Sequence, residues 1–129
     1  MSPELTILGL YGLFTVLTIL AQATAAHLQL GPRITLSARD RVPPLSPLLG
    51  RLQRCVTNGV EGLALFTPAV LVAHLSGQST GFTTLCAWSY VAARALYIPA
   101  YALGLVPWRS LIWSAGLLAT LLLLGAGLF

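Results

Sequence analysis

Long blocks of apolar residues separated by short polar stretches make up most of this chain. Four blocks are each long enough to cross a membrane as a helix, because a bilayer core of about 30 Å requires roughly 20 residues. They run over Leu5–Leu30, Gly50–Leu75, Phe82–Leu103 and Trp108–Phe129. Little chain remains outside them. The pattern therefore predicts an all-α membrane protein, with residues 1–129 forming a single four-helix transmembrane domain.

The connections between the blocks differ in length. Residues 31–49 contain four of the eight prolines and several charged side chains, and we expect these prolines to keep the segment from becoming helix. The other two connections, residues 76–81 and 104–107, are short turns. Pro68 and Pro99 fall inside predicted spans, where neighbouring helices can satisfy the carbonyl groups that proline leaves free.

Composition and charge fix an expected orientation. Hydrophobic residues make up 57% of the chain and charged residues only 8%, with a net charge of +4. Nearly all the arginines belong to the first and third connections or their borders: Arg33, Arg39, Arg41, Arg51, Arg54 and Arg109. By the positive-inside rule these connections are cytoplasmic, with both termini on the opposite side. No polar domain is left to offer a basic surface to nucleic acid. Seven arginines with no lysine, amid many Leu, Ala and Gly, suggest a GC-rich genome, which points to a bacterial inner membrane.

Two polar stripes interrupt the apolar helices. Arg51, Arg54, Asn58 and Glu61 fall within an arc of about 80° on the second span. The third span carries Tyr90, Arg94, Tyr97 and Tyr101 within about 60°. Ionisable groups at membrane depth are costly and usually face a bundle interior or a wet cavity. We therefore expect one polar pocket that opens toward the cytoplasm.

Depth suggests how the members of the stripes meet. Counted at 1.5 Å per residue, Glu61 and Arg94 both lie roughly 14 to 18 Å inside the membrane. They could form a buried ion pair that only fixes helix register, with Asn58 as an interhelical hydrogen bond and the tyrosines as packing. Against this purely structural interpretation, the arginines outnumber Glu61 in this half of the bundle. The surplus positive charge favours binding of a carboxylate or phosphate.

The fourth span begins with Pro107, Trp108, Arg109 and Ser110. Proline suits a helix start and tryptophan the membrane interface, while the cation and hydroxyl lie at the positive end of the helix dipole. This is a place to hold an anion, although Arg109 could also be a lipid-headgroup contact. Cys55 and Cys86 differ in depth by about 20 Å, so we expect them to be unpaired. His27 and His74 belong near opposite faces, and no metal site is expected.

Taken in order, these residues resemble the MAPEG family, the membrane-associated proteins in eicosanoid and glutathione metabolism. The resemblance rests on the segments Arg51 to Glu61 and Ala93 to Tyr101 and on the pair Arg109-Ser110, and Ser37 to Asp40 is similar as well. It implies a four-helix subunit, a homotrimer, and glutathione bound between neighbouring subunits. It also implies a lipophilic substrate that arrives from the bilayer.

The resemblance also assigns roles by position. Arg109 would stabilise the glutathione thiolate with help from Ser110, while the polar ends of glutathione would be held by Arg39, Arg51, Arg54, Asn58, Glu61, Arg94, Tyr97 and Tyr101. Two positions depart from some family members: Thr57 replaces a basic residue and Trp113 a tyrosine. These departures give no support to prostaglandin synthase activity.

The sequence thus favours a glutathione-dependent transferase or peroxidase of lipophilic electrophiles or hydroperoxides. A non-catalytic lipid-binding protein of the same fold is the main alternative, and Arg109-Ser110 argues against it. A small multidrug transporter also has four short helices. It would be expected to depend on a membrane carboxylate free of arginine neighbours, which Glu61 is not.

Overall fold

The computed structural model describes all 129 residues and contains helices and connecting segments only. The helices are α1 (Pro3–Leu30), α2 (Pro32–Thr35), α3 (Pro47–Leu75), α4 (Gly81–Ala102) and α5 (Trp108–Leu128). The all-α prediction is confirmed. Three of the four long helices, α1, α3 and α5, are long and apolar enough to cross a membrane. Helix α4, which carries the second polar stripe, is not among them.

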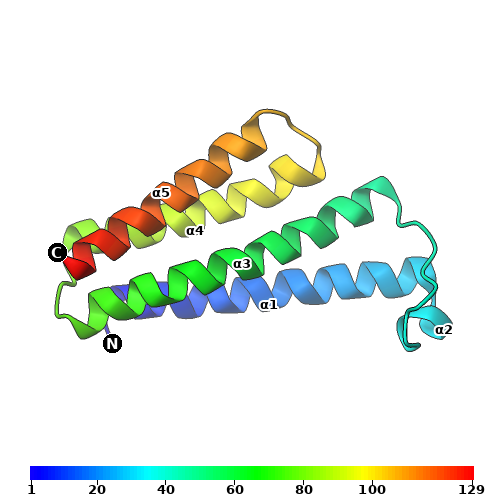
Figure 1. Ribbon diagram of the computed structural model, residues 1–129, viewed down its shortest axis with the longest axis horizontal. Coiled ribbons are helices and arrows are strands. Elements are labelled where there is room, and N and C mark those ends of the chain that lie inside the picture. The colour runs from blue at the N-terminus through cyan, green and yellow to red at the C-terminus, as the bar shows by residue number, and fades with distance from the viewer.

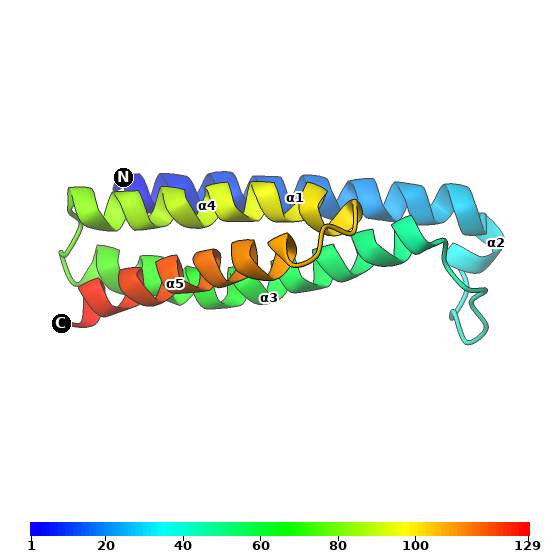
Figure 2. The ribbon, with the colours of Figure 1, turned by 90° about the horizontal axis from the view of Figure 1, so that it is seen from above.

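The four long helices run antiparallel along one axis (Figure 1). Helices α1 and α3 form one pair and α4 and α5 the other, and the pairs diverge away from the termini. Both termini lie at the end that also holds the turn between α3 and α4. Seen from above, α2 and the proline-rich loop project beyond the opposite end (Figure 2). The arginine-rich connections and the two termini therefore lie at opposite ends of the bundle.

Side-chain caps set where the helices start. Ser46 accepts a hydrogen bond from the Leu49 amide at 3.2 Å, so α3 begins with Pro47 in its first turn. The sequence placed Pro47 in the loop, but a proline in the first helical turn gives up an N–H that has no partner there in any case. The same loop also begins with the helical turn α2. At α4, Thr80 and Thr83 form a reciprocal capping box.

An aromatic cluster fills the core between α1, α3 and α4. The rings of Phe66 and Tyr90 stack with centroids 4.1 Å apart, and Tyr11 meets Tyr90 edge-on at 5.0 Å. Small residues bring the backbones together elsewhere: a Cβ built on Gly127 of α5 would lie 2.8 Å from the amide nitrogen of Ala73 on α3. Such close approach is how helices associate in a membrane, where apolar burial alone gives little driving force.

A buried carboxylate joins the helices at the end that holds the termini. Glu4 of α1 is fully buried and accepts hydrogen bonds from the hydroxyls of Ser79 at 2.7 Å, Thr84 at 3.1 Å and Thr83. Its negative charge lies at the N-terminal ends of both α1 and α4, which the helix dipoles favour. Both cysteines are buried and unpaired, as expected.

Candidate functional site

The two polar stripes meet between α3 and α4, with Arg94 at the centre. Its side chain is only 4% exposed, and Nη1 donates to Oδ1 of Asn58 at 2.6 Å. The guanidinium carbon lies 4.4 Å from the ring centroid of Tyr97, within the range of a cation–π contact. Because the amide oxygen of Asn58 is directed at Arg94, its two N–H donors are the groups that it presents to a ligand on the other side.

Arg94 is therefore bonded to Asn58 and not to Glu61, the partner that the similar depth of the two residues had suggested. Glu61 and Arg94 line the same pocket between α3, α4 and α5, together with Trp113, but the Glu61 side chain is exposed on the surface of the subunit. A carboxylate at mid-helix on a lipid-facing surface would be costly. Its exposure suggests that something else covers this face of α3.

Two glycines of α3 make room for the buried side chains of α4. A Cβ on Gly59 would lie 3.3 Å from Nη2 of Arg94, and one on Gly62 would lie 2.5 Å from the Tyr90 hydroxyl. Neither glycine was assigned a role from the sequence. Their spacing of three residues puts them on one helix face, which was the available signal.

Tyr11 of α1 is a further residue that sequence reasoning missed. Its hydroxyl donates to the Gly59 carbonyl at 3.0 Å and accepts from the Tyr90 hydroxyl at 3.1 Å. This buried chain ties α1, α3 and α4 together directly beside Arg94. A lone tyrosine inside an apolar helix gives no sequence signal that separates it from interface packing.

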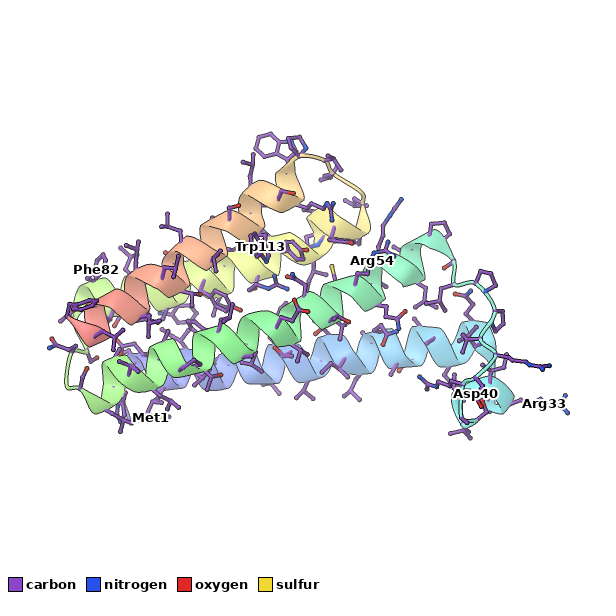
Figure 3. The ribbon with its side chains drawn as sticks, viewed as in Figure 1. Met1, Arg33, Asp40, Arg54, Phe82 and Trp113 are labelled. Carbon is purple, nitrogen blue, oxygen red and sulfur yellow. The ribbon has the colours of Figure 1, made fainter.

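Nearer the end of the bundle that carries the proline-rich loop, three arginines surround Tyr101. Nε of Arg54 donates to the Tyr101 hydroxyl at 2.8 Å, and the guanidinium carbon of Arg109 lies 4.8 Å from the ring centroid. Arg51 donates from Nη1 to the Ala102 carbonyl at 3.1 Å, which caps the end of α4. In Figure 3, Arg54 extends from α3 on the side that faces α4.

Two open hollows that share lining residues surround this group, and together with the solvent space at their mouths they measure about 510 and 590 Å³. Both are lined by Arg54, Tyr101 and Arg109, and we call them together the basic cup. The remaining lining residues are Arg51, Thr57, Asn58, Glu61, Tyr97, Gly104 and Val106. A polar pocket is therefore present at the arginine-rich end of the bundle, and most of the predicted binding residues line it.

Arg39 and Ser110 lie outside the basic cup. Arg39 has a positive φ of 60° and donates from Nε and Nη2 to the Thr35 carbonyl, at 3.1 and 2.9 Å, so within one subunit it caps α2. Figure 3 shows its neighbour Asp40 at the far end of the long helices, well away from Arg54. Ser110 follows Arg109 at the start of α5, but its side chain is exposed and lines neither hollow.

Comparison with known protein families gives a match over most of the chain. The model of the MAPEG family matches residues 7–129, which covers all four long helices. The chain belongs to the MAPEG family. No curated protein matches it. The family includes glutathione-dependent enzymes and other members, so membership alone leaves the activity to be argued from the site.

The chemistry of the basic cup of this MAPEG chain is that of an anion site. Arg51, Arg54 and Arg109 converge there, with Glu61 as the only acid in the lining. The guanidinium of Arg109 is held against the face of Tyr101 and that of Arg54 against its hydroxyl. Both cations are therefore positioned in advance, which reduces the reorganisation needed when a negative ligand binds or a thiolate forms.

Proposed function

We propose that this MAPEG protein is an integral-membrane glutathione-dependent transferase or peroxidase that activates the glutathione thiolate. The observation that carries the proposal is the placement of Arg54 and Arg109 around Tyr101 in an open cup. Glutathione has two carboxylates, an ammonium and a thiol. The cup offers guanidinium groups for the carboxylates and one carboxylate, Glu61, for the ammonium.

The individual roles follow from what each side chain has left to offer. Arg51, Arg54 and the N–H groups of Asn58 bind the carboxylates of glutathione. Arg94 is buried and contributes by holding the Asn58 amide in place, and Tyr97 and Tyr101 position the arginines beside them. Arg39 lies beyond the long helices of its own subunit (Figure 3), so it would reach the cup of a neighbouring subunit and would first have to release the Thr35 carbonyl.

Arg109 is proposed as the thiolate stabiliser. A free thiol has a pKa near 8.5, so lowering it by one unit beside a fixed guanidinium contributes about 1.4 kcal/mol and raises the thiolate fraction at neutral pH severalfold. The thiolate then adds to a lipophilic electrophile, or displaces its leaving group, to form a thioether. With a hydroperoxide it attacks the terminal oxygen, so that the O–O bond breaks, the alkoxide takes up a proton and leaves as an alcohol, and the sulfur becomes a sulfenic acid. A second glutathione reduces the sulfenic acid, giving glutathione disulfide and water. Ser110 would assist from the start of α5 only after its side chain turns toward the cup.

A homotrimer accounts for the exposed parts of the site. Glu61 and Thr57 line the cup but are exposed on the subunit, and Glu61 lies at mid-helix where lipid would otherwise meet a charge. A neighbouring copy of the chain would cover this face and complete the pocket. In this arrangement α4 is the fourth membrane span, the arginine-rich connections are cytoplasmic and the membrane is a bacterial inner membrane.

The test is conjugation of glutathione by the purified protein in mild detergent, with a panel of hydrophobic electrophiles and an organic hydroperoxide. We expect turnover with at least one electrophile, and loss of turnover in Arg109→Ala. Saturable glutathione binding without any turnover across the panel would instead support the non-catalytic member of the family. Absence of glutathione binding would overturn the proposal.

A further inference from the structure

A second cavity lies on the opposite side of Arg94 from Asn58, between α1, α3 and α4. It is partly open to the surroundings, and its lining does not include Arg54, Tyr101 or Arg109. Its walls are mainly apolar, formed by Phe14, Ala21, Leu52, Val56 and Ile98. From Tyr11 at the deep end to Gln22 at the other is eleven residues of α1, or about 16 Å. The shape is long and narrow, which suits a hydrocarbon chain.

The deep end of this cavity is polar. Arg94 lines it, and Nη2 of Arg94 lies against Gly59, beside the Tyr11 hydroxyl. The Tyr11 hydroxyl is already committed to Gly59, and Thr15 and Thr18 donate to carbonyls of their own helix. Arg94, whose one hydrogen bond to another side chain is made by Nη1, is therefore the group that can still donate to a ligand here.

Arg94 is also a buried cation that has no acid bound to it. Of the three acids in the chain, Glu4 is hydrogen-bonded to the hydroxyls of α4 and its preceding turn, and Asp40 lies in the loop beyond α2. Glu61 shares a pocket with Arg94, but its side chain is exposed and it makes no salt bridge with Arg94, whose partner is Asn58. Burying a guanidinium costs several kcal/mol unless an anion compensates it. A neutral amide such as Asn58 provides only part of that compensation.

We propose that the cavity between α1, α3 and α4 binds a fatty acid from the bilayer, with its carboxylate on Nη2 of Arg94 and its chain along Phe14, Val56 and Ile98. The chain would enter past Ala21, which is exposed at the rim. Charge complementarity selects an anionic single-chain lipid over a neutral one. This site is separate from the basic cup, and the inference stands whether or not the protein conjugates glutathione.

Parinaric acid, a fluorescent fatty acid, is a suitable probe, added to the protein in neutral detergent without glutathione. We expect saturable binding of one molecule per subunit. The methyl ester should bind about tenfold more weakly, as should the acid to Arg94→Gln, because each loses one charge-assisted hydrogen bond. Arg109→Ala should bind the acid like the wild type, which separates this site from the cup.

Matched substitutions on α1 locate the site. Thr18→Phe places a ring in the cavity and should weaken binding at least about tenfold, whereas Thr24→Phe, on an exposed face outside the cavity, should have no effect. Ala21→Trp at the rim gives a second occlusion that leaves the packed part of the bundle unchanged. Melting curves identify any variant that fails to fold.

Three results would overturn the proposal. The first is equal binding of the acid and its methyl ester, and the second is wild-type binding by both Thr18→Phe and Ala21→Trp. The third is an absence of saturable binding in the intact oligomer, which would indicate that side chains of a neighbouring copy fill the cavity.

Discussion

Asn58 accepts a 2.6 Å hydrogen bond from Nη1 of Arg94, which links the polar stripe of α3 to that of α4. This contact, rather than an ion pair with Glu61, anchors Arg94 to α3. It orients the amide of Asn58 with its N–H groups free. The pair is therefore expected to act as a unit in glutathione binding.

A double-mutant cycle tests this coupling. Asn58→Ala and Arg94→Gln should each weaken glutathione binding, and the double variant should lose less than the sum of the two by about 1 kcal/mol or more. The matched cycle of Glu61→Gln with Arg94→Gln should be closer to additive, because no hydrogen bond joins that pair. Calorimetric titration of glutathione gives both cycles. A larger coupling for Glu61 than for Asn58 would contradict the assignment.

Arg109→Ala should abolish most turnover while leaving glutathione affinity within a few-fold. The lost interaction is strong with the charged sulfur and weak with the thiol, so it affects the reactive form more than binding. The measurement combines calorimetry with conjugation rate and thiolate ultraviolet absorbance across pH. A wild-type rate and thiolate signal in the variant would make Arg109 a headgroup contact only.

Tyr101 offers two separable functions. Tyr101→Phe removes the hydrogen bond to Arg54 but keeps the ring beneath Arg109, so glutathione affinity should fall severalfold while the rate at saturation changes little. Tyr101→Leu removes both contacts and should lower affinity and rate together. Steady-state kinetics with glutathione as the varied substrate distinguishes the two effects. Equal rates in both variants would show that the ring does not position Arg109.

The Glu4 cluster should be a large local contribution to stability. Glu4→Ala removes the shared acceptor of three hydroxyl groups at a fully buried position, and we expect a loss of several kcal/mol in unfolding free energy. Glu4→Gln keeps one carbonyl acceptor and should lose less. Asp40→Asn, in the exposed loop, is the matched control and should be within about 0.5 kcal/mol. Thermal unfolding in detergent ranks the three variants.

Gly62→Ala should destabilise the bundle and shift Tyr90. The added Cβ would lie 2.5 Å from the Tyr90 hydroxyl, so that ring or the helix must move. Gly9→Ala is the control, because nothing lies within 4 Å of its added Cβ and alanine is the better helix former. Gly62→Ala should therefore melt at a lower temperature than wild type, and Gly9→Ala at the same or a higher one. The reverse order would mean that Tyr90 adapts without cost.

The sequence by itself determined the all-α class, the long helical segments and the contents of the two stripes. Long apolar blocks leave a chain in lipid little choice but helix, and a period of 3.6 residues puts Arg54 and Asn58 on one face without reference to any neighbour. The family resemblance was equally visible, because its motifs are local. The sequence did not determine every helix start, because whether Pro47 begins a helix or belongs to a loop depends on the Ser46 cap.

Only the tertiary structure decided which members of the stripes touch. Depth along the membrane placed Arg94 level with Glu61, but depth is one coordinate and leaves rotation about the helix axis free. The rotation is set by Gly59 and Gly62, which let Arg94 and Tyr90 lie against α3. Tyr11 of α1 also contributes, because its hydroxyl is hydrogen-bonded to the Gly59 carbonyl and to the Tyr90 hydroxyl. These are packing constraints between helices far apart in sequence. For this reason the sequence showed neither the Arg94–Asn58 contact nor the cavity behind it.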